Sequence, residues 1–260
     1  MDEPVKKSST RDTFESLVVT VILAIFGTTF VLQAFKIPTG SMENTLLIGD
    51  HLLVNKFIFA PQEGLLARLM PYRDLRRGDV VVFKFTPTDD QTEPGEHFVK
   101  RVIGIPGDHI RIFHRQVFVN GKAQNEPYVR HDPDYLEELR PGDDFPPPDN
   151  EYLSGATSEW SAEITSAVKN GELVVPPGKY FVMGDNREQS WDSRFWGFVS
   201  RSVVIGRPVL IYWSFETARD EYTHNALSDR IAQIVDLVIH FPTKTRWRRT
   251  LNLVDRKSVV

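Results

Sequence analysis

Ser41 is the first residue whose type and setting suggest chemistry. It lies in FKIPTGSMENTLLIGD, residues 35–50, directly after a long apolar run. A serine between Gly40 and Met42 is either a polar turn that ends a hydrophobic helix or an exposed nucleophile. The turn is not the G-x-S-x-G elbow of many hydrolases, and none of the seven histidines lies in a local pattern that marks a catalytic base. If Ser41 is a nucleophile, a lysine is the remaining side chain that could activate it.

Two lysines on apolar strands are candidates for that base. A lysine must be neutral to accept a proton, and at its ordinary pKa almost none is neutral at pH 7. Burial lowers the pKa by several units. In HFVKRVIG, strand alternation puts Lys100 between the apolar Phe98 and Val102 on one face. In DVVVFKF, Lys84 comes near the end of its strand, where it can reach water. An edge-strand lysine that discourages aggregation would explain either residue equally well.

A third stretch, GDNREQSWDSRFWG at 184–197, is a polar loop that carries aromatic residues. Trp191 and Trp196 indicate that the loop is held against a core. Asp192 and Arg194 are close enough in sequence to form a salt bridge within it. Ser190 carries a hydroxyl that can orient a neutral lysine by a hydrogen bond.

These stretches resemble the conserved blocks of bacterial type I signal peptidases (leader peptidases). The resemblance extends from about Phe35 to Phe215, in the family's order and after an apolar segment. Its blocks are IPTGSM with TLLIGD (37–42 and 45–50), RGDVVVFK (77–84), KRVIG with PGD (100–104 and 106–108), and GDNR, Ser190, DSR and WG (184–187, 190, 192–194 and 196–197).

The resemblance implies a serine protease with a serine–lysine dyad and no cofactor. It makes Ser41 the nucleophile, Lys100 the general base and Lys84 a structural residue. Hydrolysis would proceed through an acyl-enzyme. The supporting residues that it implies are Ser190, which orients the lysine; the backbone N–H of Ser41 and the hydroxyl of Thr39, which form the oxyanion hole; and Asp192 with Arg194, which form a salt bridge. Many family members have serine at the position of Thr39, and threonine keeps the hydroxyl.

The implied substrates are exported preproteins, cut after small residues in an Ala-X-Ala type of site. Shallow pockets would exclude larger side chains, and the implied lining residues are Ile37, Met42, Leu46 and Val99. The substrate strand is expected to pair with strand edges next to Ser41 and near residues 80–84.

Residues 16–35 carry no charge, and twenty helical residues would span a bilayer core. We expect a transmembrane anchor; a cleaved secretion signal and a buried core helix are the alternatives. The run is longer than the apolar core of a signal peptide and lacks its small cleavage residues. Lys6, Lys7 and Arg11 precede the run, and only Lys36 follows closely. This bias predicts a single-pass protein of the bacterial cytoplasmic membrane with residues 1–15 in the cytoplasm.

The remaining chain predicts a mainly β protein. The expected peptidase domain, residues 36–217, is an antiparallel sheet or barrel-like fold with a meander at 98–125. Its predicted strands are 51–57, 79–85, 97–104, 108–113, 116–120, 179–184 and 206–215. Residues 126–172 are acidic and proline-rich and are interpreted as an insertion with one short helix. Residues 218–260 are expected to form an amphipathic helix and a basic tail, either packed on the domain with the tail in solvent or in contact with lipid headgroups.

Composition excludes several classes. A net charge of −4 does not favour a nucleic-acid partner, and the absence of cysteine removes disulfides and thiolate metal sites. No P-loop, G-x-G-x-x-G or HExxH motif is present, so neither a cofactor nor a metal is expected. The predicted partners are signal-peptide regions and a lipid bilayer, and the chain is expected to be monomeric. A self-cleaving protein of the stress-repressor kind and an inactive, membrane-tethered peptide-binding domain are the competing functions.

Overall fold

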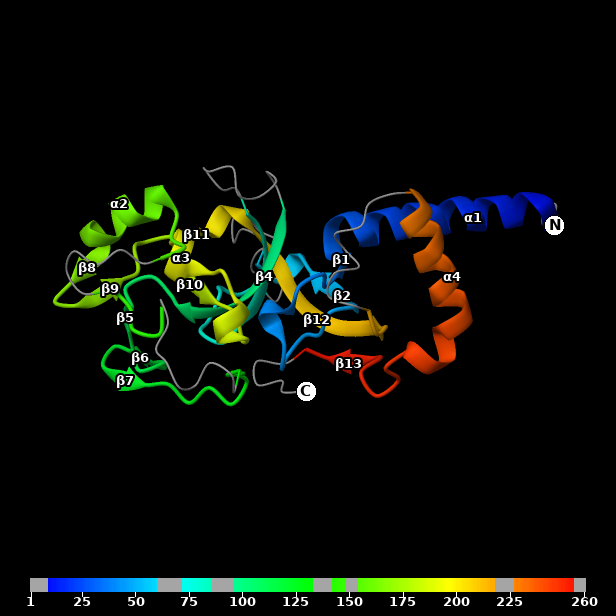
Figure 1. Cartoon of the computed structure of the whole chain (residues 1–260). Coiled ribbons are helices and arrows are strands. Elements are labelled where there is room, and N and C mark those ends of the chain that lie inside the picture. Colours follow the sequence, from blue (N-terminus) through cyan, green and yellow to red (C-terminus); the bar gives the residue numbers. More distant parts are fainter. Residues whose placement is uncertain are drawn as a thin grey trace, which may run out of the picture.

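Antiparallel strands form two sheets, with helices at their ends (Figure 1). The computed structural model describes residues 9–59, 72–85, 96–132, 142–147, 154–217 and 227–254. The eight-stranded sheet has the order β1-β2-β12-β3-β4-β10-β11, with β13 paired to β12. Its strands are β1 Leu32–Lys36, β2 Asp50–Asn55, β3 Val80–Lys84, β4 His97–Gly104, β10 Lys179–Met183, β11 Val199–Ser200, β12 Val204–Ser214 and β13 Asn252–Leu253.

The second sheet has five strands in the order β7-β6-β5-β9-β8. These are β5 His109–Phe113, β6 Gln116–Val119, β7 Lys122–Ala123, β8 Val168–Lys169 and β9 Glu172–Val174. The helices are α1 Ser9–Phe26, α2 Ser158–Ala167, α3 Ser193–Trp196 and α4 Leu227–Lys244. Each of the seven predicted strands is confirmed, and so is the short helix in the predicted insertion.

The predicted meander is correct only for β5, β6 and β7, which pair in sequence order. β4 lies in the other sheet and pairs with β3 and β10. The chain changes sheets at the turn after Gly104, where a Cβ would clash with the Ile110 side chain. Ile103, Ile110 and Phe181 are buried in one core cluster that joins the two sheets.

The N-terminal segment differs from the expected anchor. α1 ends at Phe26, a π-helical turn covers Gly27–Val31, and β1 begins at Leu32. The expectation of one helix through residue 35 is therefore wrong, because Leu32–Lys36 forms ladder hydrogen bonds with β2 instead. Among the residues described, no helix has both the length and the hydropathy needed to cross a membrane.

The described parts of the predicted insertion at 126–172 contribute residues to the core. Trp160 of α2 and Phe145 are buried in the cluster between the sheets. β8 extends the second sheet through β9. Nothing in the sequence pattern indicated this burial, because single large aromatic residues, and not a regular apolar face, make the contacts with the core.

The C-terminal segment packs on the domain through both α4 and the residues after it. Arg249 forms an ion pair with Asp50 at 2.6 Å and donates to the Thr45 carbonyl. Arg246 donates to the Ile48 carbonyl at 2.9 Å. The basic tail is therefore not wholly in solvent, since these two arginines hold the segment between Ser41 and β2.

We expect Gly49→Ala to lower the free energy of unfolding by about 3 kcal/mol or more. Gly49 has φ +87°, and an added Cβ would clash with the Phe215 carbonyl oxygen. Gly78→Ala is the matched control, because Gly78 has φ +84° but no atom within 4 Å of an added Cβ. The control should lose only about 1–2 kcal/mol of stability, which is the cost of backbone strain alone. Urea denaturation measures both; equal losses would contradict the steric argument.

Candidate active site

Ser41 lies in a tight turn that a distant loop holds in place. It is the middle residue of a 3₁₀ turn, Gly40–Met42, that follows the extended residue Thr39. An N–H at the start of such a turn has no acceptor within it. Asn186 donates its backbone N–H to the Ser41 carbonyl at 3.1 Å and its side-chain amide to the Gly40 carbonyl at 3.1 Å. These two hydrogen bonds hold the turn that carries Ser41 in place.

Lys100 is buried in the middle of β4, with only 4% of the residue exposed. The pKa of its ammonium is lowered from 10.5 to about 8, chiefly by burial; Asp192 and Asp185 act to raise it, and the positive charge of Arg194 acts to lower it. Its Nζ lies 5.8 Å from the centroid of the Phe98 ring, on the same face of the strand, as the alternation predicted. At neutral pH this lysine is far easier to deprotonate than an ordinary one.

The two carboxylates that raise the pKa of Lys100 are each held by an arginine. Arg194 forms an ion pair with Asp192 at 2.9 Å, as predicted, and both side chains are buried. Arg101 forms an ion pair with Asp185 at 2.7 Å, also buried. The charge of Arg194 therefore offsets part of the effect by which Asp192 raises the pKa of Lys100.

Asp192 is also the acceptor for the Ser190 hydroxyl, at 2.8 Å. Burial alone would raise the pKa of Asp192, but Arg194 and Lys100 lower it below its ordinary value. Ser190 lies close to the nucleophile turn, because a Cβ on Gly184 would clash with the Ser190 hydroxyl and approach the Ser41 carbonyl. Its hydroxyl oxygen keeps a lone pair that can accept from an amine.

A cavity of about 310 Å³ brings most of the predicted site together. Its lining residues include Ser41, Lys100, Thr39, Ile37, Met42 and Val99. The structure does not place Leu46 on this wall. Leu46 is fully buried in the core cluster that also contains Ile37 and Met42, since the helical turn after Ser41 points it inward. Thr39 is exposed at the cavity, where its hydroxyl has access to a ligand.

Sequence reasoning missed several residues that support the nucleophile turn. Thr45 donates its hydroxyl to Asp185 at 2.5 Å, which joins the segment after Ser41 to the loop after β10. Glu43 forms an ion pair with Arg130 at 2.6 Å. Arg101 lies over the Tyr128 ring at 3.8 Å. Tyr128 and Arg130 belong to the expected insertion, where the sequence pattern indicated no role. Arg101 and Asp185 fall within the matched blocks, and this was the one sequence signal that could have pointed to them.

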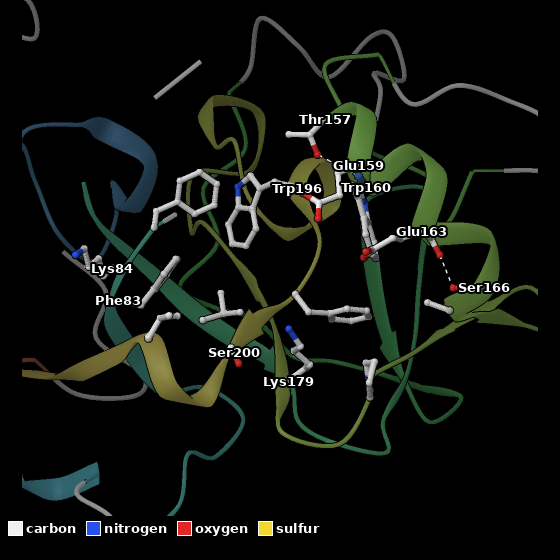
Figure 2. A pocket seen from close by; sticks show the side chains of 16 residues that line it. Phe83, Lys84, Thr157, Glu159, Trp160, Glu163, Ser166, Lys179, Trp196 and Ser200 are labelled. Atoms are coloured by element: carbon white, nitrogen blue, oxygen red, sulfur yellow. Dashed lines mark hydrogen bonds between the residues drawn. The ribbon is translucent and has the colours of Figure 1, made fainter. Parts of the chain in front are cut away.

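Lys84, the competing lysine, is exposed at the end of β3, opposite His97. It lines a different cavity of about 370 Å³ (Figure 2). Trp160 and Trp196 lie on the wall of that cavity, with Glu159 and Glu163 of α2 on one side (Figure 2). Phe85 stacks on Phe98 and contacts Trp196, so an aromatic layer separates the two cavities. Lys84 therefore does not share a cavity with Ser41.

A serine in a tight turn and a buried lysine on one cavity wall are typical of serine proteases with a lysine base. The sequence matches the family model described as signal peptidase, peptidase S26, over residues 10–213. A probable signal peptidase I-2 of Synechocystis sp. is 37% identical over 201 residues, which cover 76% of this chain and 71% of the relative. A signal peptidase I of Leptolyngbya laminosa is 32% identical over 213 residues, covering 81% and 83%.

A solved signal peptidase I from Enterococcus faecalis V583 is 28% identical and covers 52% of this chain and 97% of its own, with a TM-score of 0.34. That TM-score is too low for a comparison of the folds, and the family follows from the sequence matches. The chain belongs to the signal peptidase I family, peptidase S26. It is a serine endopeptidase that removes signal peptides from exported proteins, and the family is generally membrane-associated.

We expect Arg194→Met to lower the free energy of unfolding by about 3–5 kcal/mol, because it leaves Asp192 buried without its partner. Lys244→Met breaks the solvent-exposed ion pair with Asp236 and should lower the free energy of unfolding far less. Chemical denaturation compares the two. The pKa of Lys100 should also rise in the Arg194 variant, because a nearby positive charge is lost. Equal stability of the two variants would contradict the role of the buried pair.

Proposed function

We propose that Ser41 and Lys100 form the catalytic dyad of this signal peptidase. The observation that carries the proposal is a buried lysine with a pKa of about 8 on the wall of the cavity that contains Ser41. The exposed Lys84 does not offer this environment. Among the residues that the structure describes, the histidine on this cavity is His97, which is exposed on β4.

Neutral Lys100 takes the proton of the Ser41 hydroxyl while the oxygen attacks the carbonyl carbon of the scissile bond. The Ser41 N–H and the Thr39 hydroxyl donate to the developing oxyanion, where loss of one donor typically costs about 3–4 kcal/mol. Protonated Lys100 returns the proton to the leaving amine, and the acyl-enzyme forms. A water molecule, deprotonated by Lys100, then hydrolyses the ester. Ser190 fixes the direction of the amine, and Asp192 with Arg194 fixes Ser190.

The substrate is proposed to bind as an added strand along the first half of β4. The expected edge at residues 80–84 is taken, because β3 pairs with β4 and also with β12. β10 pairs only with the second half of β4, from Arg101 onward, so among the described residues His97–Lys100 pair on the β3 side alone. Ile37, Met42 and Val99 line the cavity beside this edge and would limit the substrate to small side chains.

The membrane topology is a further part of the proposal. From Leu17 to Phe26, α1 is uncharged and exposes apolar side chains over most of its circumference, which favours a lipid environment. The exposed set is Leu17, Val18, Val19, Val21, Ile22, Leu23, Ile25 and Phe26. We propose that the uncharged segment up to β1 anchors a monomer in the bacterial cytoplasmic membrane, with the N-terminus inside and the catalytic domain outside.

Processing of a purified preprotein tests the dyad. Ser41→Ala and Lys100→Ala should each abolish detectable cleavage, because nucleophile and base act as one unit. Lys84→Ala is the matched control and should cleave at the wild-type rate, since its ammonium is exposed. Self-cleavage of the enzyme in place of preprotein cleavage would favour the stress-repressor alternative. Wild-type cleavage by either dyad variant would refute the assignment.

Cleavage by the wild type should increase about tenfold per pH unit below about pH 8 and then level off, because only neutral Lys100 is a base. A rate that is flat between about pH 6 and about pH 9 would argue against a lysine base.

The same lowered pKa affects stability. Below the folded-state pKa of about 8, burial of the charged ammonium destabilises the fold; above it, the folded chain is deprotonated while the unfolded chain still binds a proton. The free energy of unfolding should therefore rise by about 3 kcal/mol as the pH rises from about 8 toward 10.5. Lys100→Met should remove this dependence and be more stable than the wild type at neutral pH. Denaturation curves at several pH values provide the measurement.

A further inference from the structure

One face of α4 exposes a continuous set of apolar side chains. Positions i, i+1, i+4, i+5, i+7 and i+8 share one side of a helix. In α4 these are Ile234, Val235, Val238, Ile239, Phe241 and Pro242, all exposed, with Val238 at 71%. A contiguous apolar face of this kind is uncommon on a protein surface and marks an interaction site.

Other described side chains of α4 form ion pairs or face the domain. Asp236 forms ion pairs with Lys244 at 2.7 Å and with His240 at 2.8 Å along the polar side. The side that faces the sheet contributes Leu237 to a cavity of about 250 Å³ shared with Trp213. Ile234 also lines this cavity and Phe241 contacts the Trp213 ring, so one edge of the apolar face meets the domain. Val235, Val238 and Ile239 form the exposed remainder of that face.

The position of α4 indicates what covers this face. Lys36, the first charged residue after the uncharged segment, lines the same cavity as Gln233, Ile234 and Leu237 of α4. α4 thus lies beside the end of β1, the strand that follows the proposed membrane anchor. α1 and α4 also project from the same end of the molecule, opposite α2 and the second sheet (Figure 1).

The residues after α4 have the composition of a membrane–water boundary. Trp247 is 57% exposed, and its ring contacts Phe241 edge-on at 5.8 Å. Its indole N–H donates to the Pro242 carbonyl, so the ring continues the apolar face. Arg248 beside it is exposed. Tryptophan next to a basic residue is typical of the headgroup level, where anionic lipids attract the cation.

We propose that α4 and Trp247 form an in-plane membrane helix whose apolar face enters the outer surface of the bilayer. This inference rests on the proposed anchor and adds a second, independent attachment. With contacts at α1 and at α4, the catalytic domain cannot rotate freely about its anchor. The orientation of the Ser41 cavity toward the bilayer, in which signal peptides lie, is then fixed.

Lipid quenching of a single fluorophore tests the proposal in the full chain. The sequence has no cysteine, so Val238→Cys on the apolar face and Thr243→Cys on the polar side can each be labelled alone with an environment-sensitive dye. The proteins are reconstituted in vesicles of phosphatidylethanolamine and phosphatidylglycerol that carry nitroxide acyl chains. The dye at 238 should emit at shorter wavelength and be quenched by the lipid nitroxide, while the dye at 243 should behave as in water.

Two outcomes would overturn the proposal. One is water-like emission without quenching at 238, the same as at 243. The other is short-wavelength emission at 238 that lipid nitroxide does not quench and that depends on protein density, because a second copy would then cover the face. Leu23→Cys in α1 reports on the anchor separately: absence of quenching there refutes the anchor and leaves the result at 238 to stand for α4.

A pair of charges on the exposed face tests the functional consequence. Val238→Glu with Ile239→Glu should reduce processing of a preprotein embedded in vesicles several-fold and leave cleavage of a short soluble peptide unchanged. Thr243→Glu is the control and should change neither rate. An equal loss on both substrates would overturn the membrane role, because it would indicate damage to the domain. Ser41→Ala, inactive on both, tests the dyad independently of α4.

Discussion

The buried ammonium of Lys100 is the constraint on which the rest of the site depends. A lysine in an apolar wall is unfavourable when charged, and its pKa of about 8 expresses that cost. Both nearby aspartates favour the protonated lysine, and burial outweighs them with the help of the positive charge of Arg194. Asp192 is paired with Arg194 and Asp185 with Arg101.

The same two ion pairs also hold the segments that meet at the cavity. Arg101 is the neighbour of Lys100 on β4, and Asp185 accepts from Thr45 just after the nucleophile turn. Asn186, the residue after Asp185, holds the carbonyls of Gly40 and Ser41. Charge neutralisation and positioning are therefore performed by one network, which explains why so many polar residues are buried beside so few reactive groups.

The proposed membrane topology explains why such a network is needed. In that topology the substrate bond lies near a bilayer, so the cavity must be held at a set height and direction. α1 supplies an apolar helix, and α4 supplies an amphipathic one at the level of Lys36. Arg246 and Arg249 tie the segment after α4 to the stretch that follows Ser41. A contact made by α4 with lipid is thus mechanically connected to the nucleophile turn.

Much of this was predictable from local pattern. Alternation identified the strands and the inward direction of Lys100, and the spacing within 190–194 predicted the Asp192–Arg194 pair. Three expectations were wrong for a shared reason. Each depended on the partner that a segment meets in the fold. The end of the expected helix pairs with β2, the expected substrate edge of β3 pairs with β12, and Leu46 packs in the core instead of on the cavity wall.

The sequence by itself determined the residue types, the order of the blocks and the family, because these are properties of the chain read in one dimension. Only the tertiary structure decided that Asp185 is bound by Arg101 across the fold, and that Arg130 of the expected insertion reaches Glu43. It also decided that the pKa of Lys100 falls. Burial and charge pairing act over distances of a few ångströms in space, and residues so paired here are up to 199 positions apart along the chain.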